Sequence, residues 1–113
     1  MQPGDVVLMS LPQIGGGPFK FRPVLLLTNL PGPYQNVLVC GISTQLHQQV
    51  RDWDELIQPG DADFDASGLH DTSIIRLSYL YAEQSKEIAG KIGAIDRARL
   101  QRLQKRLGAH LEP

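Results

Sequence analysis

The chain has 113 residues, of which 42% are hydrophobic, and a formal net charge of -1. This size suits one compact domain spanning residues 1–113 and excludes two. The only cysteine, Cys40, excludes an internal disulfide, and the N-terminus has neither the basic nor the long apolar region of a signal peptide. No apolar run approaches the ~20 residues of a membrane span, so we expect a soluble cytoplasmic protein with no membrane partner.

The charges are unevenly distributed along the chain. Seven acidic residues and no Lys or Arg lie between Asp52 and Asp71, whereas five cations lie between residues 97 and 106. The acidic stretch predicts a solvated loop, and the basic segment predicts an ordinary solvated helix face. Any nucleic-acid site is therefore expected to be local rather than spread over the whole protein.

The first half of the chain is predicted to form strands. Residues 6–9 follow a turn-forming Pro-Gly-Asp, and a glycine-rich loop at 13–21 leads into a strand at 22–29. The continuous apolar run of that strand predicts burial on both faces or a dimer contact. A third buried strand is expected at 37–43, and a short exposed one at 53–57.

The second half adds two more strands and then changes period. Residues 73–80 are rich in β-branched and aromatic types, and a short strand is expected around 91–95. From Ile95 onward, leucines fall mainly three or four residues apart, which predicts an amphipathic helix with Asp96 as N-cap. Gly108 is expected to stop or interrupt that helix.

Several familiar chemistries are not supported by the residues. The glycines at 15–17 lack the Lys-Ser/Thr of a phosphate-binding loop. Asp61, Asp63 and Asp65 have the opening spacing of a calcium loop, but its glycine and its bidentate glutamate are missing. The three histidines are far apart with no neighbouring Cys, so we expect no metal site and no cofactor. Cys40 lies in an apolar run and is expected to be a buried, unreactive thiol.

One pair of segments could hold a phosphate without a metal. Arg22 precedes Pro23 at the start of the apolar strand, and Ser43 and Thr44 end the next one. A guanidinium and a hydroxyl are both good phosphate donors. On residue types alone, however, a strand-edge charge and ordinary turn chemistry explain these residues better.

The order of motifs along nearly the whole chain resembles the MazF/PemK family of toxin endoribonucleases from bacterial type II toxin-antitoxin systems. The motifs that carry the resemblance are Gly4-Asp5-Val6-Val7, Arg22-Pro23-Val24-Leu25-Leu26-Leu27 with Asn29, Ile42-Ser43-Thr44-Gln45, Gly68-Leu69, Ser73-Ile74-Ile75-Arg76-Leu77 and Ile92-Gly93-Ala94-Ile95. The resemblance implies a mainly β fold, an SH3-like, partly open β-barrel of the CcdB/PemK toxin type with a C-terminal α-helix. It also implies a homodimer.

The family's activity implies a metal-independent mRNA interferase that cleaves single-stranded RNA through 2′-hydroxyl attack. A cognate antitoxin is the implied partner, in a complex that binds DNA. The family's catalytic arginine falls on Arg22 and its threonine on Ser43, where the usual Thr-Ser/Ala order is inverted. Thr44 takes that role if the register slips by one residue. RNA-binding residues are expected at Phe19, Lys20, Phe21, Gln45 and Arg76.

Two alternatives stay open. The chain could be a non-enzymatic relative that inhibits gyrase through a helix and loops, or a binding module that has lost catalysis. Serine keeps the hydroxyl of threonine but loses the methyl that restricts its rotamer, which makes the second alternative worth testing. Retention of Arg22 favours the ribonuclease.

Overall fold

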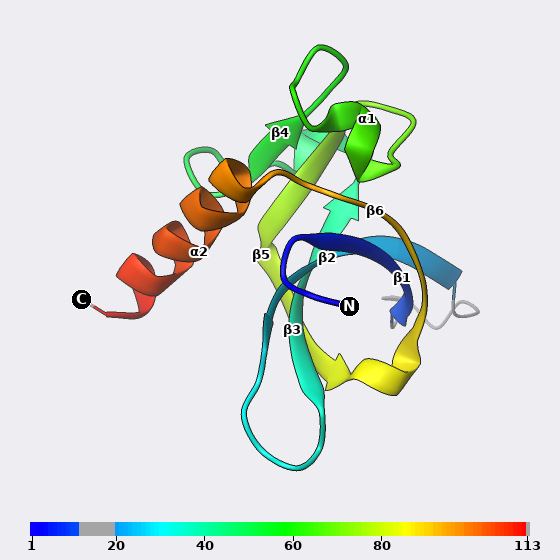
Figure 1. Ribbon diagram of the computed structural model, residues 1–113. Coiled ribbons are helices and arrows are strands. Elements are labelled where there is room, and N and C mark those ends of the chain that lie inside the picture. The colour runs from blue at the N-terminus through cyan, green and yellow to red at the C-terminus, as the bar shows by residue number, and fades with distance from the viewer. Residues whose placement is uncertain (12–19, 113) are drawn as a thin grey trace.

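The computed structural model of the protein, which describes residues 1–11 and 20–112, is built mainly from β-strands (Figure 1). The strands are β1 (Asp5–Leu11), β2 (Lys20–Asn29), β3 (Asn36–Ser43), β4 (Glu55–Ile57), β5 (Ser73–Gln84) and β6 (Ile88–Ala94). The helices are η1 (Leu46–Gln48), α1 (Phe64–Ser67), η2 (Ser85–Glu87) and α2 (Arg97–Leu111). The predicted strands are all present, although β4 is shorter and β5 longer than expected.

The six strands form one antiparallel sheet in the order β4-β5-β3-β2-β1-β6. Figure 1 shows β1, β2, β3 and β6 bending around a common axis. Register shifts interrupt the pairing of β1 with β6, β2 with β3 and β3 with β5, and such bulges increase the local twist of a sheet. The sheet does not close, so the expected partly open barrel with a C-terminal helix is confirmed.

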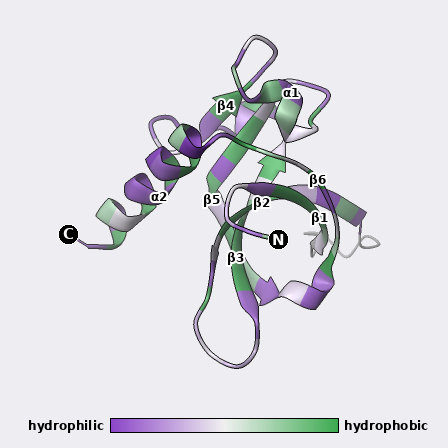
Figure 2. Ribbon diagram, in the orientation of Figure 1, coloured by the Kyte–Doolittle hydropathy of each residue, from purple (hydrophilic) through white to green (hydrophobic). Residues whose placement is uncertain are grey.

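Strand β2 separates two hydrophobic clusters because its side chains alternate between the faces of the sheet. Val24 and Leu26 belong to one cluster, which we call the inner cluster and which also contains Val7, Met9, Val37 and Val39. Leu25 and Leu27 belong to the other, which packs against α2 through Leu103. Figure 2 shows the matching hydrophobic colour along these strands. The predicted burial of β2 on both faces is confirmed.

Helix α2 begins where the sequence predicts it to begin. The Asp96 carboxylate accepts a hydrogen bond from the Arg99 backbone N–H at 2.8 Å, as an N-cap does. The predicted stop at Gly108 is wrong, because the helix continues to Leu111. A glycine inside a helix costs only about 1 kcal/mol relative to alanine, and the Gly108 carbonyl still accepts from the Glu112 N–H.

The prediction that the acidic stretch and the basic helix are both solvated is wrong for part of each segment, although Asp65, Arg97 and Lys105 are exposed as expected. Arg99 is 7% exposed and Asp63 only 3%, and the two are joined by the Arg99 Nε to Asp63 Oδ2 bond of 2.8 Å. The same guanidinium donates to Glu55 at 2.9 Å and to Asp61 at 3.0 Å. Arg102 and Arg106 also pair with Glu55. The two charged segments therefore neutralise each other across the fold.

These pairs move the pKa values of the carboxyl groups. Burial alone would raise the pKa of Glu55, but the hydrogen bond and charge of Arg102, with smaller contributions from Arg99 and Arg106, bring it below its usual value. For Asp63, burial is likewise outweighed, mainly by the hydrogen bond from Arg99, so its pKa is also lowered. Both groups therefore favour the folded state in their charged form.

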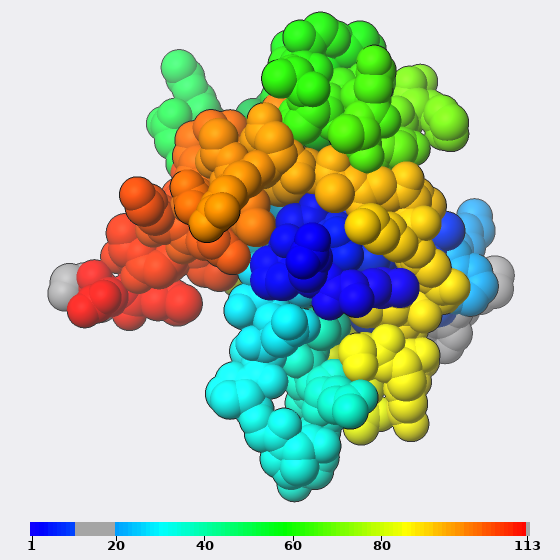
Figure 3. Space-filling view, in the orientation of Figure 1, coloured from blue at the N-terminus to red at the C-terminus, as the bar shows by residue number. Residues whose placement is uncertain are grey.

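Close backbone approaches hold the remaining elements on the sheet. A Cβ on Gly93 of β6 would overlap the Ala66 carbonyl oxygen of α1, so α1 packs directly on the β6 backbone. The Gly4 carbonyl accepts from the Ile95 N–H at 2.9 Å, and in Figure 3 the N-terminal residues (blue) accordingly lie between the start of α2 (orange) and β6 (yellow).

Candidate functional site

Arg22 and Ser43 are held by neighbouring strands. Arg22 is exposed near the start of β2, opposite Met9 of β1, and half-buried Ser43 ends β3, opposite Ile74 of β5. The pairing of β2 with β3 ends at Val24 with Gly41, so Arg22 and Ser43 each lie two residues beyond that last pair on neighbouring strands. Strand alternation puts both side chains on the face of the inner cluster.

The Ser43 hydroxyl has both a donor and an acceptor. It accepts a hydrogen bond from the Gln45 backbone N–H at 3.0 Å and donates to Gln48 Oε1 at 3.4 Å. The first contact fixes the oxygen, and the second directs the hydroxyl proton toward Gln48. Gln45 thus supports the hydroxyl through its backbone, while its side chain is exposed.

Arg76 lies on the same face because it pairs with Gly41, two residues before Ser43. Its Nη1 donates to Gln48 Oε1 at 3.2 Å, and its guanidinium carbon is 5.7 Å from the centre of the Tyr79 ring, within cation–π range. Its Nε is buried and has no acceptor among residues 1–11 and 20–112. Arg76 therefore brings a second cation to the site with an unused donor.

A pocket of about 450 Å³ adjoins Ser43. Thr44 lines it together with Pro23 of β2, Ile92 of β6 and the loop at residues 68–71. Ser43 lines the pocket as well, and Thr44 lies in a bend directly after the end of β3. Both hydroxyls therefore border the pocket, and Ser43 is in addition linked to Arg76 through Gln48.

The other predicted RNA-binding residues are less closely gathered. Lys20 and Phe21 are exposed at the start of β2, where they pair with Leu11 and Ser10 of β1. Phe21 is 63% exposed. Alternation places Lys20, but not Phe21, on the face of Arg22. The predicted residue Phe19 lies outside the described residues.

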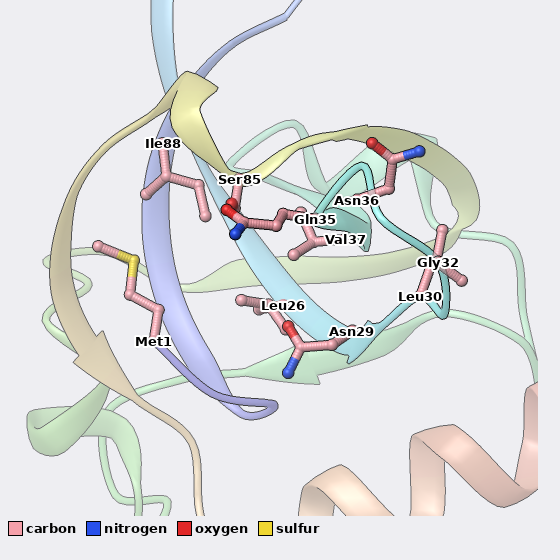
Figure 4. Close-up of a pocket in the computed structure, with 10 residues that line it drawn as sticks. All are labelled: Met1, Leu26, Asn29, Leu30, Gly32, Gln35, Asn36, Val37, Ser85 and Ile88. Atoms are coloured by element: carbon pink, nitrogen blue, oxygen red, sulfur yellow. The ribbon is translucent and has the colours of Figure 1, made fainter.

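A second pocket, of about 510 Å³, lies at the other end of β2 (Figure 4). Its floor includes Leu26 and Val37, and its rim carries the amides of Asn29 and Gln35. No charged residue lines it, and Asn29 is seven residues from Arg22, roughly 20 Å along an extended strand. This pocket is therefore separate from the group formed by Arg22, Ser43 and Arg76, which we call the cationic site.

The described residues contain neither a cluster of metal ligands nor a helix that could span a membrane. No group of three or more potential His, Cys, Asp or Glu ligands gathers in residues 1–11 and 20–112. Within the same ranges, no helix has both the length and the apolar character needed to cross a membrane. Cys40 is fully buried, and burial, followed by the charge of Asp54, raises the pKa of its thiol. The thiol is thus unsuited to act as a nucleophile.

Sequence reasoning missed Gln48. It is exposed at the end of the short helix η1 and belongs to no recognisable motif, and its partner Arg76 is 28 residues away. Only the pairing of β3 with β5 shows that Ser43, Gln48 and Arg76 meet. Of the residues in the quoted motifs, Arg76 is the one that contacts Gln48 and could have indicated this cluster.

The motif order and this geometry agree with a family comparison. Residues 2–111 match the model of the PemK-like, MazF-like toxin of type II toxin-antitoxin systems. No individual curated protein matches closely enough to add to that comparison. Because the match spans all but three residues of the chain and the strand order fits the same fold, the protein belongs to the PemK-like, MazF-like family of type II toxins.

Proposed function

We propose that this toxin is an endoribonuclease that cleaves single-stranded messenger RNA in the cytoplasm without a metal ion. The observation that supports the proposal is the placement of Arg22, Ser43 and Arg76 on one face of three neighbouring strands, with Ser43 and Arg76 linked through Gln48. Arg22 and Arg76 supply positive charge on this face, and the Ser43 hydroxyl donates to Gln48, whose Oε1 also accepts from Arg76. Family membership supplies the toxin context.

The chemistry begins with attack of a ribose 2′-hydroxyl on the adjacent phosphate. Negative charge grows on the phosphoryl oxygens, and the Arg22 guanidinium stabilises it more in the transition state than in the ground state. The 2′-hydroxyl loses one proton and the leaving 5′-oxygen gains one, with Ser43 positioning the phosphate or relaying a proton. The products are a 2′,3′-cyclic phosphate and a free 5′-hydroxyl.

Substrate binding draws on the surrounding residues. Lys20 attracts the RNA backbone, Phe21 offers an exposed ring for base stacking worth about 1–3 kcal/mol, and Gln45 offers its amide. The pocket beside Thr44 has apolar walls and polar groups at its rim, which suits a base next to the cleaved bond.

We also propose that the toxin is a homodimer and that its cognate antitoxin covers this site in a complex that binds DNA. Type II toxin family membership implies an antitoxin partner. A chain of 12.5 kDa should then elute as a species of about twice that mass in sizing experiments at micromolar concentration. Elution as a monomer would contradict the proposed dimer but would leave the proposed ribonuclease activity unaffected.

The ribonuclease is tested by analysing the ends of RNA fragments formed in the presence of EDTA. Cleavage at limited sites should leave cyclic phosphates and 5′-hydroxyls. Ser43→Ala should lower kcat by about tenfold or more, whereas Thr44→Val, at the residue that follows β3, should change it little. Intact RNA with wild-type protein would refute the proposal, and inhibition of gyrase would then support the gyrase-poison alternative. Loss of activity in Thr44→Val but not in Ser43→Ala would reverse the assignment of the hydroxyl.

A further inference from the structure

The Gln48 side chain lies between Ser43 and Arg76. Its Oε1 accepts from two groups at once, the Ser43 hydroxyl at 3.4 Å and the Arg76 Nη1 at 3.2 Å. These two groups come from different strands, and each is a normal partner of a phosphate oxygen. A neutral amide oxygen therefore occupies the point at which both donors converge.

The guanidinium is poorly matched to that acceptor. Arginine presents a planar fork of donors that suits two oxygens of one anion, whereas the amide oxygen satisfies only Nη1. The buried Nε of Arg76 has no acceptor within the described ranges. A buried donor without a partner costs about 1–3 kcal/mol, so the single contact with Gln48 leaves Arg76 incompletely satisfied.

The local backbone holds Gln48 in this place without fixing it firmly. Gln48 ends the three-residue helix η1, and its N–H donates to the Gln45 carbonyl at 3.0 Å. No side chain caps η1, and all of its residues are exposed. The side chain can therefore leave without disturbing either hydrophobic cluster.

We propose that Gln48 gates the site: its amide oxygen occupies, in the free protein, the position that a non-bridging phosphate oxygen of RNA takes on binding. The inference rests on the proposed function for its substrate. RNA displaces the amide because hydrogen bonds from a guanidinium to an anionic oxygen are stronger than those to a neutral one. Gln48 thus lowers the affinity for RNA while keeping Ser43 and Arg76 in position.

The test compares binding of a fluorescein-labelled, 2′-O-methyl single-stranded RNA pool, which cannot be cleaved, by fluorescence anisotropy. Gln48→Ala should bind about fivefold more tightly than wild type, since displacement no longer breaks a hydrogen bond of about 1 kcal/mol. Gln48→Glu should bind at least tenfold more weakly at pH 7, because its carboxylate pairs with Arg76. The matched control is Gln49→Glu, which adds the same charge at an exposed neighbour whose side chain makes no hydrogen bond within the described part of the chain.

A pH series separates gating from a purely structural role. The ratio of Kd for Gln48→Glu to that for wild type should fall toward one as the pH is lowered and the introduced carboxylate is protonated, while the ratio for Gln49→Glu should stay close to one at every pH. Weaker binding by Gln48→Ala, or equal effects of the two glutamates, would overturn the proposal. If wild type cleaves no RNA but the predicted binding order holds, the ribonuclease fails and the gate stands. Wild type that binds no RNA would refute both.

Discussion

Replacing Arg99 by methionine should destabilise the fold strongly. Arg99 is 7% exposed and donates to three carboxylates and to the Leu56 carbonyl. Methionine fills much of the same space but leaves Asp63, which is 3% exposed, with only the Asp96 N–H as a partner outside its own helix. Removing one member of a buried pair costs about 3–5 kcal/mol.

The lower end of that range applies here. Glu55 keeps Arg102 and Arg106, and the Asp61 side chain is 30% exposed and can be solvated, so only Asp63 is left buried without its cation. We therefore expect a loss of about 3 kcal/mol in the free energy of unfolding, measured by urea denaturation at pH 7. Arg97→Met is the matched control, because Arg97 is exposed in the same helix turn.

The loss should also depend on pH. In the wild type the folded pKa of Asp63 is lowered, so its contribution is complete above the ordinary aspartate pKa of about 3.9 and disappears as the pH falls through the folded value. In Arg99→Met the buried carboxyl has lost its cation, and protonation relieves it. The difference between the two proteins should therefore shrink below pH ~4. A loss under 1 kcal/mol, or a loss that is constant with pH, would refute this account of the cluster.

Two further predictions concern packing. Gly93→Ala should lower the free energy of unfolding by several kcal/mol, because its methyl group would overlap the Ala66 carbonyl. Gly90→Ala, on the same strand, is the control, because its methyl group would meet no atom within 4 Å. Equal melting temperatures for the two variants would contradict the packing of α1 on β6. Cys40, fully buried with a raised thiol pKa, should react with a thiol reagent only after unfolding; rapid reaction of the native protein would show that the core opens.

The strands could be predicted from sequence because their pattern is local. The apolar run from Val24 to Leu27 and the alternation beginning at Ser73 each indicate a strand within a few residues. The chain order of Arg22 and Ser43 further indicated the site through the family resemblance. What the pattern could not give was the exact length of β5, since its pairing with β3 continues past a bulge after Cys40.

The contacts between distant segments could not be predicted. The acidic stretch and the basic helix each indicate solvated surface when taken alone, yet Arg99 reaches carboxylates 36 to 44 residues away. Gln48 depends in the same way on a strand pairing that brings Arg76 beside it. Such pairs are set by tertiary register, which residue types within one segment do not encode.

The central claim is that the Arg22 guanidinium stabilises the transition state of RNA cleavage. The most direct test measures the single-turnover cleavage rate of a long single-stranded RNA in EDTA for wild type, Arg22→Ala and the exposed-arginine control Arg97→Ala. We expect wild type to cleave, Arg22→Ala to lose at least about a hundredfold in rate, and Arg97→Ala to remain near wild type. Cleavage by Arg22→Ala at the wild-type rate, with all three proteins folded, would contradict the claim.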